Sequence, residues 1–143
     1  MILFPSNVFI RHLHRGSVIK FTHPDFPDKP HYFVVLNENP SKDGFLLLVA
    51  CTSNTDGIRK IIGIQKHLGL GYVVVKTGEY ECFDRESYIN CHEAYPFEIG
   101  KIKKRYEKGR VELKDPLPQG LIDKVLKACS DSPMFKPRYK KFL

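Results

Sequence analysis

Short apolar runs recur along the chain, and glycine, proline and polar turn residues separate them. The runs are rich in β-branched and aromatic residues and have the length of strands rather than helices. The run "FLLLVACTS" is apolar almost throughout, which is typical of a strand that is covered on both faces. The predicted strands lie within residues 16–23, 31–37, 45–53, 71–78 and 86–99, and the last of these ranges holds one or two strands.

Two stretches have the spacing of a helix instead. In "PQGLIDKVLKAC", residues 118–129, the apolar positions fall on one helical face, and Pro118 suits a first turn. In "IGKIKKRYEKG", residues 99–109, the apolar residues share one face and the basic residues the other. A short helix is also expected from Ser6, whereas residues 58–70 fit either kind of element.

The connections between the strands predict how the chain is arranged. "PDFPDKP" holds three prolines and is therefore a loop, and "ENPSKDG" has the composition of a hairpin connection. Short strands joined in this way predict a mainly β domain, in which a strongly bent sheet curls into a partly closed barrel with a C-terminal α-helix. The length suits one domain over residues 1–133, followed by a mobile basic tail over residues 134–143.

The charge of the chain favours an anionic partner. Lys and Arg number 23 against 16 Asp and Glu, which gives a formal net charge of +7. Much of the excess lies in "KIKKRYEKGR" and "MFKPRYKKFL". Such clusters attract phosphates, so a nucleic acid or an acidic protein is the expected partner. The alternative is that these runs are ordinary solvated faces.

Other classes of protein find little support in the sequence. The four cysteines form no C-x-x-C pair, so we expect no metal and no cofactor. No apolar run reaches the roughly 20 residues that cross a bilayer, and the first residues do not have the order of a secretory signal. A cytoplasmic protein is therefore expected. Phosphate-binding glycine loops and the common hydrolase motifs are missing from the sequence.

Candidate chemistry lies at the strand ends, where a small β domain presents its functional groups. His23, Lys29 and His31 flank the proline-rich loop, and Thr52 and Ser53 directly follow an apolar strand. None of these spacings dictates a reaction. An imidazole such as His31 is as well explained by a hydrogen bond to the loop backbone, and Thr52 by a hydrogen bond to the turn that it precedes.

The order of "GSVIKF", a proline-rich loop, "HYFVVLN", a turn and "FLLLVACTS" resembles the start of the PemK/MazF family of bacterial toxins. The likeness extends to "DRESYINCHEAYPF" and to the final helix, and in outline it covers about four-fifths of the chain. It is strongest to a divergent branch that has a histidine before the second strand. The resemblance implies an SH3-like barrel that cleaves RNA, works as a homodimer and is held in check by a cognate antitoxin.

The resemblance also implies roles for single residues. Thr52 falls on the catalytic Thr or Ser of the toxins, and Gly16 falls on the glycine that opens their first strand, with Ser17 in place of the usual Asp. His31 stands where the toxins have a catalytic Arg. Because a histidine can exchange protons and an arginine cannot, the mechanism need not be that of the family.

Metal-independent RNA cleavage needs a base, an acid and donors that stabilise the charged phosphorane. Our hypothesis gives His31 a proton-transfer role, with Lys29 and Thr52 as donors and His23 as a second proton carrier. The predicted contacts to RNA are base stacking by two aromatic residues and polar or charged contacts by the others. These residues are Phe26, Tyr32, Ser53, Lys103, Lys104 and Arg105.

Two further functions are compatible with the sequence. One is a barrel that binds nucleic acid or protein without catalysis, because a fold alone does not determine a function. The other is a small accessory protein of phage or mobile-element origin whose basic surface meets an acidic partner.

Overall fold

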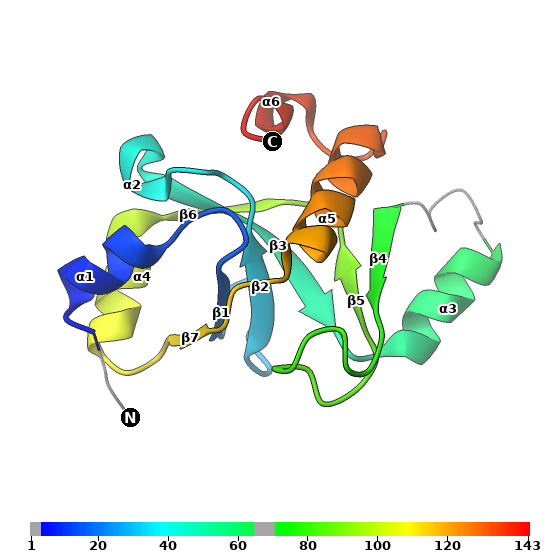
Figure 1. Ribbon diagram of the computed structural model, residues 1–143, viewed down its shortest axis with the longest axis horizontal. Helices are drawn as coiled ribbons and strands as arrows, with labels where there is room; N and C mark the ends of the chain where they lie inside the picture. Colours follow the sequence, from blue (N-terminus) through cyan, green and yellow to red (C-terminus); the bar gives the residue numbers. More distant parts are fainter. Residues whose placement is uncertain (1–3, 65–70) are drawn as a thin grey trace.

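The structure is a computed structural model, and it describes residues 4–64 and 71–143. Figure 1 shows a central sheet with helices on both sides. The strands are β1 (Val18–Phe21), β2 (His31–Val35), β3 (Phe45–Thr52), β4 (Tyr72–Val75), β5 (Ser87–Asn90), β6 (Tyr95–Glu98) and β7 (Glu112–Lys114). The helices are α1 (Ser6–His12), α2 (Pro40–Asp43), α3 (Thr55–Ile64), α4 (Ile99–Glu107), α5 (Gln119–Asp131) and α6 (Pro137–Lys140).

The strands form an antiparallel sheet in the order β4-β5-β3-β2-β1-β7, and β6 also pairs with β3. The central strand β3 changes partners along its length. On one edge it pairs first with β6 and then with β5, and on the other edge it pairs with β2. The prediction of a mainly β fold is therefore confirmed.

The sheet does not close into the predicted barrel. Within the described ranges, the outer strands β4 and β7 do not pair with each other. The helix α5 lies over one face of this open sheet in Figure 1. Its apolar residues, among them Leu121 and Val125, belong to the same buried core as Val34 and Val73 of the sheet. A helix thus covers this face of the sheet and shares its apolar core.

Each face of the sheet has its own apolar core, as the composition of β3 predicted. Leu47 and Val49 contribute to the core under α5, whereas Leu46 and Leu48 contribute to the core under α1 and α4. All four side chains are buried. Because side chains alternate along a strand, an uninterrupted apolar run supplies both cores at once.

Gly16 joins the start of β1 to two other elements. Its N–H donates to the Val35 carbonyl at 2.8 Å, and its carbonyl accepts from the Leu117 N–H at 2.8 Å. Its φ of +89° lies in the left-handed region, and a Cβ at this position would come within 2.3 Å of Ile122 Cδ1 on α5. Only glycine meets both conditions without strain.

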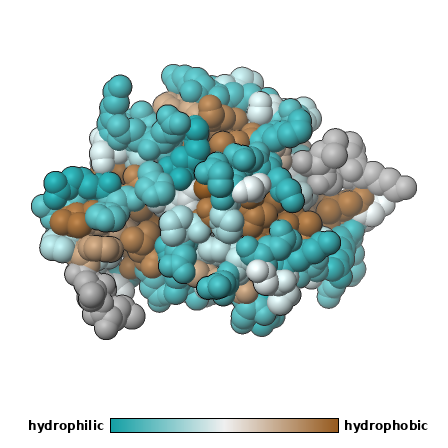
Figure 2. Space-filling view, in the orientation of Figure 1, coloured by the Kyte–Doolittle hydropathy of each residue, from teal (hydrophilic) through white to brown (hydrophobic). Residues whose placement is uncertain are grey.

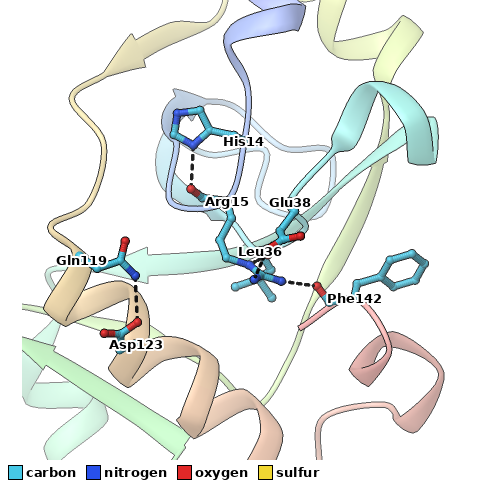
Figure 3. Close-up of polar contacts among 7 residues, drawn as sticks. All are labelled: His14, Arg15, Leu36, Glu38, Gln119, Asp123 and Phe142. Atoms are coloured by element: carbon cyan, nitrogen blue, oxygen red, sulfur yellow. Dashed lines mark hydrogen bonds and ion pairs between the residues drawn. The ribbon is translucent and has the colours of Figure 1, made fainter.

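Residues 134–143 differ from the predicted mobile tail. Phe135 is 1% exposed, and Tyr139, Phe142 and Leu143 pack against the core under α5. Figure 3 shows Arg15 reaching this segment, because its guanidinium donates to the carbonyls of Leu36 and Phe142 and pairs with Glu38. The basic composition had suggested a solvated tail, but its aromatic residues anchor it.

The described helices include none that is long and apolar enough to cross a membrane. The face shown in Figure 2 is largely hydrophilic, with hydrophobic patches near α1 and α3. Phe4 and Ile61 are among the exposed large apolar side chains. Residues 58–64 belong to α3, and residues 65–70 of the stretch that fitted either element lie outside the described residues.

Candidate functional site

A cavity of about 320 Å³ opens where β2 and β3 separate. Five of the residues predicted for the active site or for RNA contacts line it. They are Lys29, His31, Tyr32, Thr52 and Ser53. The remaining wall comes from Lys20, Pro30 and Cys51, from Cys82, Phe83 and Asp84 in the segment before β5, and from Ser87 at the start of β5. The volume is at the lower end of the range for small-ligand sites.

The pairing of the strands explains why His31 and Thr52 both line this cavity. The β2–β3 ladder ends at Phe33 and Ala50, and the same register continued by two residues sets His31 opposite Thr52. Residues opposite each other in an antiparallel pair point to the same side of the sheet. The backbone of His31 stays paired with Phe21 of β1, and that of Thr52 with Tyr88 of β5. We call this opening the β2–β3 fork.

A backbone hydrogen bond determines which ring nitrogen of His31 is available. Its Nδ1 lies 3.1 Å from the carbonyl oxygen of Lys29. A carbonyl can only accept, so Nδ1 carries the hydrogen of the neutral ring. The other nitrogen, Nε2, then has a lone pair and can take a proton. The hydrogen bond to the loop that the sequence suggested as an alternative role therefore exists, and it is compatible with a base.

The Thr52 hydroxyl has a structural role as well. Its Oγ1 accepts a hydrogen bond from the Asn54 N–H at 3.1 Å, which fixes the turn after β3. A hydroxyl can accept and donate at the same time, so the Thr52 proton is still available to an oxygen in the cavity. The Thr52 hydroxyl can therefore donate to a phosphate oxygen. Its hydrogen bond to the turn is by itself enough to explain where the side chain lies.

Two lysines give the cavity its charge. The Nζ of Lys20 lies 5.1 Å from the ring centroid of Tyr32, and Lys29 lies on the loop before β2. The carboxylate in the lining belongs to Asp84, which pairs with Arg85 at 3.5 Å. An anionic group is therefore favoured in this cavity over a cationic one.

The two aromatic residues predicted to stack on bases are already engaged by protein groups. Lys20 covers a face of the Tyr32 ring, and Phe83 contacts that ring at a centroid distance of 5.0 Å. Phe26 contacts His31 at 5.3 Å and Tyr95 at 5.2 Å. Tyr32 lines the cavity and Phe26 contacts His31, so protein groups already cover part of each ring.

His23, predicted as the second proton carrier, does not line the cavity, so the structure does not bring it together with His31 and Thr52. It is 5% exposed and packs among Phe21, Phe33 and Phe97, in the core under α4. Its Nδ1 accepts the Asp25 N–H at 3.0 Å. The loop after β1 turns back over this face of the sheet, and the sequence around His23 does not show that turn.

The burial of His23 makes the stability of the protein depend on pH. Burial lowers its pKa below the ordinary value, the nearby Asp25 carboxylate opposes this shift, and the Arg105 guanidinium adds to it. The unfolded chain therefore binds a proton near pH 6.5 that the folded chain binds only at lower pH. We expect the free energy of unfolding to fall as the pH drops from 7.5 through 6.5 towards the lowered pKa.

Urea unfolding followed by circular dichroism between pH 7.5 and 5 checks this expectation. In His23→Phe the same pH series should show a smaller loss of stability than in the unaltered protein. An equal loss in both proteins would mean that other groups cause the pH dependence.

The basic residues predicted on the helix lie on α4, outside the cavity. Lys104 is exposed, while Lys103 is half-buried. Arg105 is held in place, because its guanidinium donates to the Thr22 carbonyl at 2.8 Å and lies 5.4 Å from the ring centroid of Phe97. Arg105 thus has a structural role, because it connects α4 to the sheet.

The prediction missed two charged residues that line the cavity. Lys20 lies in the middle of β1, and its register partner is Tyr32, which brings it to the cavity. Asp84 lies in the segment before β5. The alternation along "VIKF" shows that Lys20 points away from Ile19 and Phe21, but only the pairing of β1 with β2 reveals what it points to.

The chain was also compared with known proteins. A scan against protein-family models and a search of curated proteins found no match to this chain.

Proposed function

We propose that the protein is an endoribonuclease that cleaves RNA without needing a metal ion. The observation that supports this proposal best is the β2–β3 fork, where His31 and Thr52 line one open cavity together with Lys20 and Lys29. A proton acceptor, a hydroxyl donor and two cations are groups that phosphodiester cleavage can use.

The proposed reaction uses the 2′-hydroxyl of the RNA as the nucleophile. His31 Nε2 takes the proton of this hydroxyl, and the 2′-oxygen forms a bond to phosphorus. The bond from phosphorus to the 5′-oxygen then breaks. Lys29, Lys20 and the Thr52 hydroxyl stabilise the phosphorane charge. The described lining residues include no second imidazole, so the leaving 5′-oxygen takes its proton from solvent or from the protonated His31.

The wider context of this proposal comes from the resemblance to the PemK/MazF toxins. We propose an SH3-like relationship for the bent sheet, in which an open arrangement replaces the closed barrel. A homodimer, a cognate antitoxin that blocks the cavity and action in the cytoplasm are parts of the same proposal. The support for them is the order of the motifs "GSVIKF", "HYFVVLN" and "FLLLVACTS".

The products of the reaction test this mechanism. Incubation of the protein with an unstructured RNA in EDTA should give fragments with 2′,3′-cyclic phosphate and 5′-hydroxyl ends. The same RNA with a 2′-deoxy nucleotide at the cleaved position should stay intact there. Fragments with 3′-hydroxyl ends, or cleavage of the deoxy position, would contradict attack by the 2′-hydroxyl.

A second candidate function is binding of nucleic acid without catalysis. The observation that favours it is that His31 and Thr52 both have structural hydrogen bonds and that His23 lies elsewhere. A protein of this kind would bind the same RNA, and binding would weaken with salt, but no cleavage products would form over hours.

A further inference from the structure

A second hollow adjoins the cavity. It has a volume of about 480 Å³ and shares Lys20 and Pro30 with the lining of the cavity. Its other side is formed by Arg105, in the last turn of α4, and by Arg110, in the connection from α4 to β7. The hollow thus extends from the β2–β3 fork across β1 towards α4, which follows the strand order β3-β2-β1-β7.

A third hollow continues the same path onto α4. Its volume is about 250 Å³, and it shares Arg105 and Arg110 with the second. Among the residues that the structure describes, each one that lines it is a lysine or an arginine. They are Lys101, Lys104, Arg105, Lys108 and Arg110. We call the three adjoining hollows, from the fork to α4, the basic track.

The negative groups of the basic track are neutralised. The acidic residues among its described lining are Asp84 and Glu112. Asp84 pairs with Arg85, and Glu112 pairs with Lys114 at 2.8 Å, which also lowers the pKa of Glu112. In contrast, Lys101, Lys104, Lys108 and Arg110 form no ion pair with any described residue. The track therefore keeps its positive charge.

We propose that the basic track binds a single strand of RNA whose cleaved phosphate lies at the β2–β3 fork. The strand leaves the cavity over Pro30 and Lys20 and crosses β1 towards α4, where its phosphates meet the four unpaired cations. This inference rests on the proposed function, because it takes RNA as the ligand. A chain of phosphates fits the track better than a protein, because the α4 end is lined with cations alone and offers no apolar anchor.

The length of the bound RNA tests the proposal. A fluorescein-labelled 2′-O-methyl oligouridylate cannot be cleaved, so fluorescence anisotropy measures its binding apart from catalysis. The track variant carries Lys101→Gln, Lys104→Gln, Lys108→Gln and Arg110→Gln. The matched control removes four exposed lysines elsewhere, with Lys42→Gln, Lys60→Gln, Lys124→Gln and Lys127→Gln.

For an oligonucleotide of about 12 residues, we expect the track variant to raise Kd at least about tenfold and the control variant less than about threefold. The slope of log K against log salt should fall by about 0.7 for each phosphate that the track variant no longer neutralises. An oligonucleotide of about 3 residues should fill the cavity alone, so its Kd should be the same for the unaltered protein and the track variant. Thermal melting confirms that both variants fold.

Three results would overturn the inference. One is that the track and control variants weaken RNA binding equally, which would show that the overall positive charge of the protein attracts the RNA. The second is no weakening by either. The third is displacement of the RNA by a polyglutamate peptide that binds at least as tightly, which would mark the track as a surface for an acidic protein. Failure of the proposed function differs from all three, because the track would then bind RNA as expected while cleavable RNA stayed intact.

Discussion

His31→Ala should lower the rate of RNA cleavage at least about a hundredfold while the protein stays folded. The expected loss is large because the variant removes the imidazole that lines the cavity and that, in the proposed mechanism, takes the 2′-hydroxyl proton. His31 is half-buried at the tip of β2, so its replacement leaves both apolar cores intact. The measurement is the initial rate of fragment formation from a labelled RNA in EDTA.

His12→Ala is the matched control for His31→Ala. His12 is an exposed histidine on α1, and it does not line the cavity. This variant should cleave RNA at the rate of the unaltered protein. The unaltered protein, His31→Ala and His12→Ala are purified in the same way, so a contaminating nuclease would give equal cleavage rates in all three. Equal cleavage by His31→Ala and His12→Ala would remove His31 from the mechanism.

Gly16→Ala should lower the free energy of unfolding by about 3 kcal/mol, since two costs add at this position. The first is the backbone, because φ of +89° is unfavourable for a residue with a Cβ. The second is steric, because the new methyl group would come within 2.3 Å of Ile122 Cδ1. Urea unfolding at fixed pH, followed by circular dichroism, measures the change.

Gly44→Ala separates the two costs. Gly44 ends α2 with φ of +83°, and a Cβ built there has no heavy atom within 4 Å. This variant carries the backbone cost alone, about 1 kcal/mol. Adding Ile122→Val to Gly16→Ala removes the Cδ1 atom and should relieve part of the steric clash. The double variant should therefore be less destabilised than the sum of the two single variants. An additive result would mean that Ile122 has no part in the effect.

The sequence predicted the strands that have a clear local pattern, an apolar run with turn residues at each end. β2 and β3 are long apolar runs with turns at both ends, and α5 has a clear buried face, so local pattern sufficed. β7 was missed because it is three residues long and forms by pairing with β1. The open sheet was missed for a similar reason, since the position of α5 over one face of the sheet depends on contacts between distant segments.

In the candidate site, too, the residues found from the sequence are those with a local signal, and the residues missed depend on tertiary structure. His31 and Thr52 were found because both stand at strand ends next to turns, where the pattern changes from apolar to polar. Lys20 was missed because its position depends on the register of β1 against β2. His23 was misplaced because a proline-rich loop has no periodicity that shows which face of the sheet it covers. Register and loop direction are tertiary properties, and neither follows from local composition.

The β2–β3 fork has a mechanical consequence. The tip of β2 is bonded to β1 on one side, but its pairing with β3 stops at Phe33. Spreading the two arms about Phe33 and Ala50 would therefore break no residue pairing of the β2–β3 ladder. His31 stays bonded to β1 and Thr52 to β5, so any widening of the cleft has to carry one of these neighbouring strands with it. The stiffness of the two outer ladders, and not of β2 and β3 alone, therefore sets how wide the cleft can open.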